Sequence, residues 1–355
     1  KQVSQSERDR VIANLRERNV ELYYGRAAFV DPHTIRVTQS GGKSIDLRGR
    51  FILIATGSSP VHPPGFKFED PRIWDSSEIL QIAFLPKNLG VVGAGVIGAE
   101  YACTFAALGT KVHIIDGRGV LLPFLDEEVS PALTTAMRAQ LGIEFLFNER
   151  VVECDSSKPG DVTLKLSSGQ TLSFDAVLVA AGRTSNTSDL NLVAAGITPG
   201  KRGLIEVESG YRTSVSHICA AGDVIGFPAL AATSMEQARI AMCHAFDKTY
   251  KTAMSPVLPT GVYTIPEVSM VGETEQSLRE NGIEYVSGKA MYSQNARGRI
   301  IGDTAGFLKL LFRRDDKRLV GVHVIGELAT EVVHIGVMAM LCDAKAEVFN
   351  RACFN

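Results

Sequence analysis

The sequence has 355 residues, of which 45% are hydrophobic and 21% are charged, and its formal net charge is −2. This composition is typical of a globular protein with two or three domains, and it argues against a general nucleic-acid binder, which would carry a basic face. No apolar run is long enough to predict a membrane span, and the polar N-terminus lacks the apolar stretch of a signal peptide. We therefore expect neither a nucleic acid nor a membrane as partner.

The cysteines are isolated along the chain. None forms a C-x-x-C pair, and none has metal-ligand spacing with the seven histidines, so no metal site is expected. Isolated cysteines in a chain of this size are typical of a reduced, cytoplasmic protein, and most of them should be small buried side chains.

The first 86 residues predict one helix and then a strand-rich stretch that ends at Thr56-Gly57. The helix is expected over residues 7–18, and the strands are expected at Tyr24–Val30, His33–Thr38, Ser44–Leu47 and Phe51–Ala55.

A strand–helix–strand pattern follows. The expected elements are a strand at Leu89–Val92, a helix at Val96–Leu108 that stops at Gly109, and a strand at Lys111–Ile115. Ser130-Pro131 predicts an N-cap with proline at the first helical position, for a helix that runs to Leu141 and precedes a strand at Ile143–Phe147.

Residues 162–183 repeat the earlier strand-rich pattern. A two-stranded ribbon leads into an apolar strand, Ala176–Ala180, that ends in Ala181-Gly182-Arg183. This second copy follows a full βαβ unit, whereas the first copy follows only one helix. We therefore expect the chain to begin inside a domain whose first half would hold another glycine-rich loop.

The remaining chain predicts two regions. A strand from His217 ends in Ala221-Gly222-Asp223 and leads into a helix at Ala231–Phe246. After Pro256 the pattern changes to α+β and predicts a separate domain. Its expected strands are Val268–Val271, Tyr285–Tyr292, Gly306–Phe312 and Leu319–Ile325, and its expected helices are Thr274–Glu280 and Leu328–Leu341.

The motif Gly93-x-Gly95-x-x-Gly98 predicts a dinucleotide-binding turn. It follows a strand, opens a helix, and precedes a strand that ends at an acidic residue, Asp116. Gly93 should permit the tight turn, Gly95 the approach of the backbone to a pyrophosphate, and Gly98 close packing of helix on strand. A nicotinamide dinucleotide is therefore the expected ligand.

The residues after this motif leave the choice of nucleotide open. Asp116 should accept hydrogen bonds from ribose hydroxyls, which favours NAD, whereas Arg118 could pair with the 2′-phosphate of NADP or be a surface charge. Glu100, two residues after Gly98, either contacts the nicotinamide end or is an ordinary acidic residue at the start of a helix.

Two further observations concern other candidate residues. Asp223 ends an apolar strand, where it could accept hydrogen bonds from a ribose or polyol, or cap the next segment. His323 and His334 lie in apolar runs and are expected to be core or interface residues.

Five ordered motifs resemble the two-dinucleotide-fold flavoprotein disulfide reductase family, which includes lipoamide dehydrogenase and glutathione reductase. They lie at residues 51–57, 93–102, 180–183, 220–224 and 261–269, and two further segments, at 222–232 and 334–336, resemble the transhydrogenase branch of that family. The resemblance implies an α/β fold with Rossmann-like FAD- and NAD(P)-binding domains, the FAD-binding one incomplete, and an α+β C-terminal dimerisation domain.

The same resemblance implies domain limits and site roles. Residues 1–86 would be a partial FAD-binding domain, 87–186 the NAD(P)-binding domain, 187–256 the return segment of the FAD-binding domain, and 257–355 a truncated dimerisation domain of a homodimer. Gly57 would lie against FAD, Asp223 would bind its ribityl chain, and Ala231 would lie near the flavin. Gly182 would help to shape the NAD(P) site, and Glu100, the candidate catalytic residue, would lie where nicotinamide meets flavin.

The activity implied by the resemblance is FAD-dependent hydride transfer between NADPH and NAD⁺, with each nucleotide using one site in turn. One alternative is a lipoamide-dehydrogenase-like disulfide reductase, which would need a cysteine pair in a segment that this sequence does not contain. A second alternative is a non-catalytic NAD-binding fragment. Bound flavin and turnover would distinguish either enzyme from the non-catalytic fragment.

Overall fold

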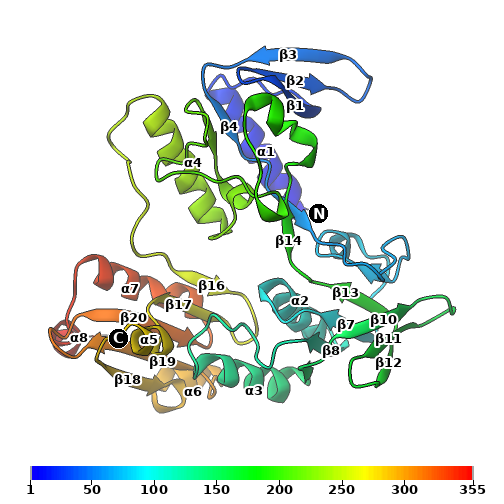
Figure 1. Ribbon diagram of the computed structural model, residues 1–355. Helices are drawn as coiled ribbons and strands as arrows, with labels where there is room; N and C mark the ends of the chain where they lie inside the picture. Colours follow the sequence, from blue (N-terminus) through cyan, green and yellow to red (C-terminus); the bar gives the residue numbers. More distant parts are fainter. Residues whose placement is uncertain (1, 354–355) are drawn as a thin grey trace. The chain divides into compact units, whose positions relative to one another are not determined.

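The computed structural model describes residues 2–353 (Figure 1). The chain forms two compact units, and each unit is built from two separate segments. One unit combines the residues before Pro60 with Arg183–Met254, and the other combines Pro60–Gly182 with the residues from Ser255 onward. No helix within residues 2–353 is long and apolar enough to cross a bilayer.

The first unit contains a short parallel strand pair next to an antiparallel sheet. β4 (Ile52–Ile54) pairs in parallel with β15 (Ile218–Ala220), so the carboxyl ends of both strands lie at one edge. The antiparallel sheet has the order β1-β2-β3. Its strands and the helices of this unit are α1 (Gln2–Glu17), β1 (Arg26–Asp31), β2 (Thr34–Thr38), β3 (Ser44–Arg48), η2 (Ser188–Leu190), η3 (Leu192–Ala195), η4 (Lys201–Gly203), η5 (Gly222–Ile225) and α4 (Ala231–Ala245). A ribbon of β5 (Ser58–Pro60) and β14 (Arg183–Ser185) lies where the chain leaves and re-enters this unit.

The second unit begins with a five-stranded parallel sheet in the order β6-β13-β7-β8-β9. Figure 1 labels its strands β13, β7 and β8. Its strands are β6 (Ile73–Trp74), β7 (Asn88–Val92), β8 (Lys111–Asp116), β9 (Glu144–Phe147) and β13 (Ala176–Val179), with helices η1 (Glu78–Gln81), α2 (Val96–Ala107) and α3 (Val129–Leu141). α2 packs against β7 and β8, and apolar side chains of these elements are fully buried. An antiparallel ribbon adds β10 (Val151–Asp155), β11 (Val162–Leu166) and β12 (Thr171–Phe174).

The C-terminal part of this unit is a five-stranded antiparallel sheet in the order β16-β17-β20-β19-β18. Helix α7 (Ala329–Leu341) packs on β17 and β20. The other elements are β16 (Thr260–Val262), β17 (Val268–Gly272), α5 (Glu275–Glu280), β18 (Tyr285–Met291), η6 (Tyr292–Gln294), α6 (Ala296–Ile301), β19 (Phe307–Arg313), β20 (Leu319–Ile325) and α8 (Ala346–Arg351).

A buried lysine joins the two sheets of the second unit. The Lys309 side chain on β19 is 1% exposed, and its Nζ lies 2.8 Å from Asp126 Oδ1, 2.9 Å from Glu128 Oε2 and 3.0 Å from Glu275 Oε1. Burial lowers the pKa of Lys309, but hydrogen bonds to these carboxylates outweigh burial and hold its pKa above the ordinary value. Since the aspartate follows β8 and the lysine belongs to the C-terminal sheet, this network fixes one sheet to the other.

Most of the expected elements are confirmed, and α2, β8, β9 and β20 have the expected limits within one residue. The helix cap expected at Ser130 is wrong. α3 begins at Val129, and the Ser130 hydroxyl donates to the Leu121 carbonyl oxygen instead of capping the helix. Pro131 still lies in the first turn, where its missing N–H costs no helical hydrogen bond. His323 is fully buried, as expected for a core histidine, whereas His334 is exposed in this chain.

Candidate functional site

A cavity of about 660 Å³ lies at the carboxyl ends of β7, β8 and β13 in the second unit. It brings together five of the candidate residues predicted from the sequence: Gly93, Gly95, Asp116, Arg118 and Gly182. Its lining also includes Pro63, Phe66, Val92, Ile115, Gly117, Glu149, Arg150, Val151, Ala180 and Ala181. Ligands of open parallel sheets bind at this edge, so the cavity has the expected place for a dinucleotide.

The three motif glycines differ in whether the fold itself requires a glycine. Gly93 has φ +113°, and a Cβ there would lie 2.4 Å from the Ala180 carbonyl oxygen. A Cβ at Gly98 would lie 2.0 Å from the Gly93 carbonyl oxygen, so this glycine allows the helix to pack on the turn. A Cβ at Gly95 would meet no protein atom within 4 Å, and Gly95 has φ −82°, which any residue adopts. The protein itself therefore gives no steric reason for a glycine at position 95.

The first turn of α2 is open to an anion. Gly95 is the N-cap of α2, and no side chain caps the helix, so its first N–H groups have no side-chain acceptor at the cap. These donors and the positive end of the helix dipole together favour a phosphate group. The Gly95 backbone lies in the cavity lining, which places this helix end beside the cavity.

Asp116 at the end of β8 is nearly buried, and protein donors occupy both of its oxygens. Oδ2 accepts from Ala94 N at 2.6 Å and from Arg118 Nη2 at 2.7 Å, and Oδ1 accepts from Arg118 N at 2.8 Å and Arg118 Nε at 2.9 Å. Burial raises the pKa of Asp116, but these hydrogen bonds outweigh burial and hold its pKa below the ordinary value. The carboxylate thus holds the glycine turn and the Arg118 guanidinium at the same time.

Gly182 also lines the cavity. It follows β13, has φ +106°, and its carbonyl oxygen accepts from Val61 N at 3.0 Å. No protein atom lies within 4 Å of a Cβ built there, so the backbone conformation is what requires a glycine at this position.

Glu100 does not belong to the cavity lining but is tied to a loop of the C-terminal sheet. Its Oε1 accepts from Tyr263 N at 2.9 Å, and one turn further along α2 the Cys103 sulfur accepts from Ile265 N at 3.3 Å. Burial raises the pKa of Cys103 to about 11, so this thiol is a packing group and not a nucleophile. The loop that contains Tyr263 therefore has a fixed place along α2.

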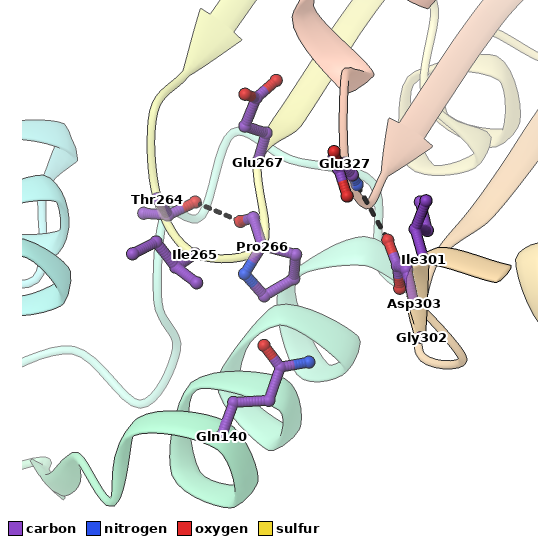
Figure 2. Close-up of a pocket in the computed structure, with 9 residues that line it drawn as sticks. All are labelled: Gln140, Thr264, Ile265, Pro266, Glu267, Ile301, Gly302, Asp303 and Glu327. Atoms are coloured by element: carbon purple, nitrogen blue, oxygen red, sulfur yellow. Dashed lines mark hydrogen bonds between the residues drawn. The ribbon is translucent and has the colours of Figure 1, made fainter. Parts of the chain in front are cut away.

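Figure 2 shows a second pocket of the same unit, lined by residues of this loop, of α3 and of the segments around Asp303 and Glu327. Two of its three acidic side chains have structural partners: Asp303 Oδ2 accepts from Glu327 N at 2.8 Å, and Glu267 Oε2 accepts from Thr330 N and Oγ1 at 3.2 and 2.8 Å. These carboxylates cap turns of the fold, and they give no chemical reason to place a ligand there.

In the first unit, the residues predicted to contact FAD lie at the joint edge of β4 and β15. The Ser58 hydroxyl, next to Gly57, donates to Asp223 Oδ2 at 2.6 Å, and Arg183 Nε donates to the same hydroxyl at 2.7 Å. Gly57 has φ +70° with open space at its Cβ position. Within residues 2–353 no partner is recorded for Asp223 Oδ1, which leaves an acceptor for a hydroxyl group.

Ala231 is the first residue of α4, whose N-cap, Leu230, provides no side-chain cap. The first turn of this helix lies beside Gly222, because a Cβ there would be 3.3 Å from Ser234 Oγ. The structure thus places an uncapped helix start next to the Asp223 segment. A carboxylate acceptor and a helix N-terminus fit the polyol and phosphate groups of a flavin nucleotide.

Sequence reasoning missed several residues of these sites. Arg150 lines the dinucleotide cavity, Tyr263 holds Glu100, and Ser58 and Arg183 hold Asp223. The Thr56-Gly57-Ser58 and Gly182-Arg183 corners could have indicated the last two, since each corner follows an apolar strand, β4 in the first case and β13 in the second. The contact of Tyr263 with Glu100 joins residues 163 positions apart and has no local signal.

A parallel sheet with a glycine-rich turn, an uncapped helix start and an acidic residue on the next strand defines a dinucleotide-binding protein. Comparisons with known proteins narrow this class. A family model described as pyridine nucleotide-disulphide oxidoreductase matches residues 1–244, and the model of the dimerisation domain of that family matches residues 258–355. The chain belongs to the pyridine nucleotide-disulphide oxidoreductase family.

Individual relatives are similar over most of their length. A soluble pyridine nucleotide transhydrogenase of Mycobacterium bovis is 46% identical over 97% of this chain and 74% of the relative. A soluble pyridine nucleotide transhydrogenase of Colwellia psychrerythraea is 42% identical over 89% of this chain and 68% of the relative. Among solved structures, the HOCl-induced flavoprotein disulfide reductase RclA from Escherichia coli has a TM-score of 0.93 at 28% identity. The match spans 100% of this chain and 80% of the RclA chain. LpdA from Mycobacterium tuberculosis has a TM-score of 0.91 at 25% identity, and the match spans 100% of this chain and 78% of LpdA.

Proposed function

We propose that this protein is an FAD-dependent oxidoreductase that transfers hydride between NADPH and NAD⁺. The observation that carries the proposal is Gly95. It has an ordinary backbone conformation and open space where a side chain would be, at an uncapped helix start in the lining of a cavity. Such a glycine is explained by a ligand that approaches the backbone. The names of relatives at 42–46% identity support the particular reaction.

The dinucleotide would be bound in three parts. The backbone from Gly93 to Gly98 and the first turn of α2 would bind the pyrophosphate, with Gly182 in the same cavity lining. The pair of Asp116 and Arg118 would face the adenosine ribose, and Glu100 would lie toward the nicotinamide, held in place by the Tyr263 N–H. Glu100 would then orient the nicotinamide.

The residues of the first unit would hold the resident cofactor. Asp223, fixed by Ser58, would accept from hydroxyls of the ribityl chain, Gly57 would let the backbone lie against FAD, and the start of α4 at Ala231 would face the flavin. Bound FAD supplies the redox chemistry, because it can accept a hydride from one nicotinamide and give it to another.

The expected domain limits also stand as part of the proposal. Residues 1–86 and 187–256 would form the FAD-binding part, 87–186 the NAD(P)-binding domain and 257–355 the dimerisation domain. The match of the dimerisation-domain model to residues 258–355 supports a homodimer. Six free cysteines, three of them buried, support a reducing, cytoplasmic location.

The proposal is tested with the purified protein, FAD, NADPH and the thionicotinamide analogue of NAD⁺, whose reduced form absorbs apart from NADPH. Reduction of the analogue, with parallel lines in double-reciprocal plots, is the expected result for two nucleotides that use one site in turn. Turnover with lipoamide or another disulfide and none with the analogue would replace the proposal with a disulfide reductase. Binding of NADH without flavin or turnover would indicate a nucleotide-binding protein.

A further inference from the structure

Arg150 lies beside the residues that end β8. The segment between β9 and β10 runs along that strand end, because Glu149 N donates to the Asp116 carbonyl oxygen at 3.1 Å and Asn148 N donates to the Arg118 carbonyl oxygen at 3.2 Å. These backbone hydrogen bonds set the position of Arg150 in the cavity lining. Its location is therefore built into the sheet, although its side chain is exposed.

Gly117 provides the space for this arginine. A Cβ at Gly117 would lie 3.0 Å from Arg150 Nε and 3.2 Å from its Cγ, so the arginine side chain lies across the Gly117 backbone. Gly117 is not among the residues with a positive φ, and its conformation does not require a glycine. A side chain at position 117 would instead push the Arg150 side chain away from the strand end.

The other charged side chains around Arg150 already have partners. Arg118 is paired with Asp116, and Glu149 Oε2 is turned toward Ser167 Oγ at 2.7 Å and Ser168 N at 3.1 Å. In the part of the chain that the structure describes, no hydrogen bond or ion pair is recorded for the Arg150 guanidinium. The cavity thus has one paired and one unpaired guanidinium at the end of β8.

The end of the second strand of a dinucleotide-binding unit is where the 2′ position of the adenosine ribose lies. NADP carries a phosphate there and NAD a hydroxyl. A guanidinium binds a phosphate with two parallel charge-assisted hydrogen bonds, and it stays hydrated when no phosphate is present. We infer that Arg150 is the residue that binds the 2′-phosphate, so that the site accepts NADPH through Arg150 and NADH without it. This inference rests on the proposed dinucleotide site.

The test uses two probes without nicotinamide, adenosine 2′,5′-bisphosphate and adenosine 5′-monophosphate, titrated by calorimetry into the whole protein. Arg150→Gln should weaken binding of the bisphosphate by about tenfold or more and leave the affinity for the monophosphate unchanged. Arg150→Lys should recover part of the loss, and Gly117→Ala should weaken the bisphosphate by displacing Arg150. The control is Lys165→Gln, which removes one exposed positive charge from the neighbouring β11 outside the cavity and should change neither affinity.

The outcomes separate this inference from the proposed function. Equal affinity of Arg150→Gln and the unchanged protein for the bisphosphate, or an equal loss for both probes, overturns the role of Arg150 and leaves the dinucleotide site standing. An unchanged protein that binds neither these probes nor NADH overturns the site and this inference with it.

Discussion

Replacing Gly95 with valine separates binding from folding. The Cβ at this position meets no protein atom within 4 Å, and φ −82° with ψ −178° is open to valine. The cost to the fold is therefore limited to the weaker N-cap, about 1 kcal/mol. The added methyl groups would occupy the space through which a pyrophosphate approaches the first N–H groups of α2.

The magnitude follows from those hydrogen bonds. A hydrogen bond to a charged group contributes about 1.5–3 kcal/mol, so the loss of one or two costs roughly 3 kcal/mol. That corresponds to a rise in Kd of roughly 100-fold, because each 1.4 kcal/mol is about tenfold. NADH fluorescence titration gives the affinity, and urea unfolding of the same samples gives the stability.

Gly98→Ala is the matched control. Its Cβ would lie 2.0 Å from the Gly93 carbonyl oxygen, so it should destabilise the fold by about 1–3 kcal/mol. The two variants should therefore differ: Gly95→Val loses affinity with little loss of stability, and Gly98→Ala loses stability. Unchanged NADH affinity in Gly95→Val, or a loss of affinity that only follows a loss of stability, would refute the reasoning.

Other positions give further expected outcomes. Arg118→Ala leaves the Asp116 carboxylate without its guanidinium partner at the ribose end, so NADPH binding should weaken by about tenfold and NADH binding less. Equal losses for both nucleotides in fluorescence titrations would show that the Asp116–Arg118 pair does not discriminate between them. Asp223→Ala should lower the FAD retained per chain after gel filtration, and full FAD content would contradict its role. Lys309→Met leaves the buried Asp126 carboxylate without its ion-pair partner and should cost about 3–5 kcal/mol in urea unfolding, whereas a loss below about 1 kcal/mol would show that this ion pair is dispensable. Hydrogen bonds from the Arg72 guanidinium lower the pKa of Asp70 from 3.8 to about 2. Asp70→Asn should therefore cost about 2 kcal/mol at pH 7, and the difference from the unchanged protein should disappear as the pH falls from about 4 toward 2; a difference that persists at pH 2 would exclude ionisation as its cause.

The dinucleotide motif could be predicted because its requirements are local. The tight turn at Gly93 and the close contact between Gly93 and Gly98 involve residues five positions apart, so spacing alone indicates them. Asp116 could be predicted to lie at the same edge, since it ends the neighbouring parallel strand.

The partners of these residues could not be predicted in the same way. The donors on Asp116 include the Ala94 N–H across the turn, and the donor on Glu100 comes from Tyr263 in the C-terminal sheet. Ser130 shows the opposite error. Its sequence context is that of a helix cap, but its hydroxyl donates to the Leu121 carbonyl oxygen, and the helix begins at Val129, two residues before the expected start at Pro131. In each case a tertiary contact decides which hydrogen bond forms.

The most direct test of the central proposal is the visible absorbance spectrum of the purified protein under anaerobic conditions, with NADPH added first and NAD⁺ afterwards. A flavin band that bleaches with NADPH and returns with NAD⁺ is the predicted result, since both half-reactions would then occur at one flavin. A band that bleaches with NADPH and returns only with a disulfide, or a colourless protein that binds NADH, would contradict hydride transfer between the two nucleotides.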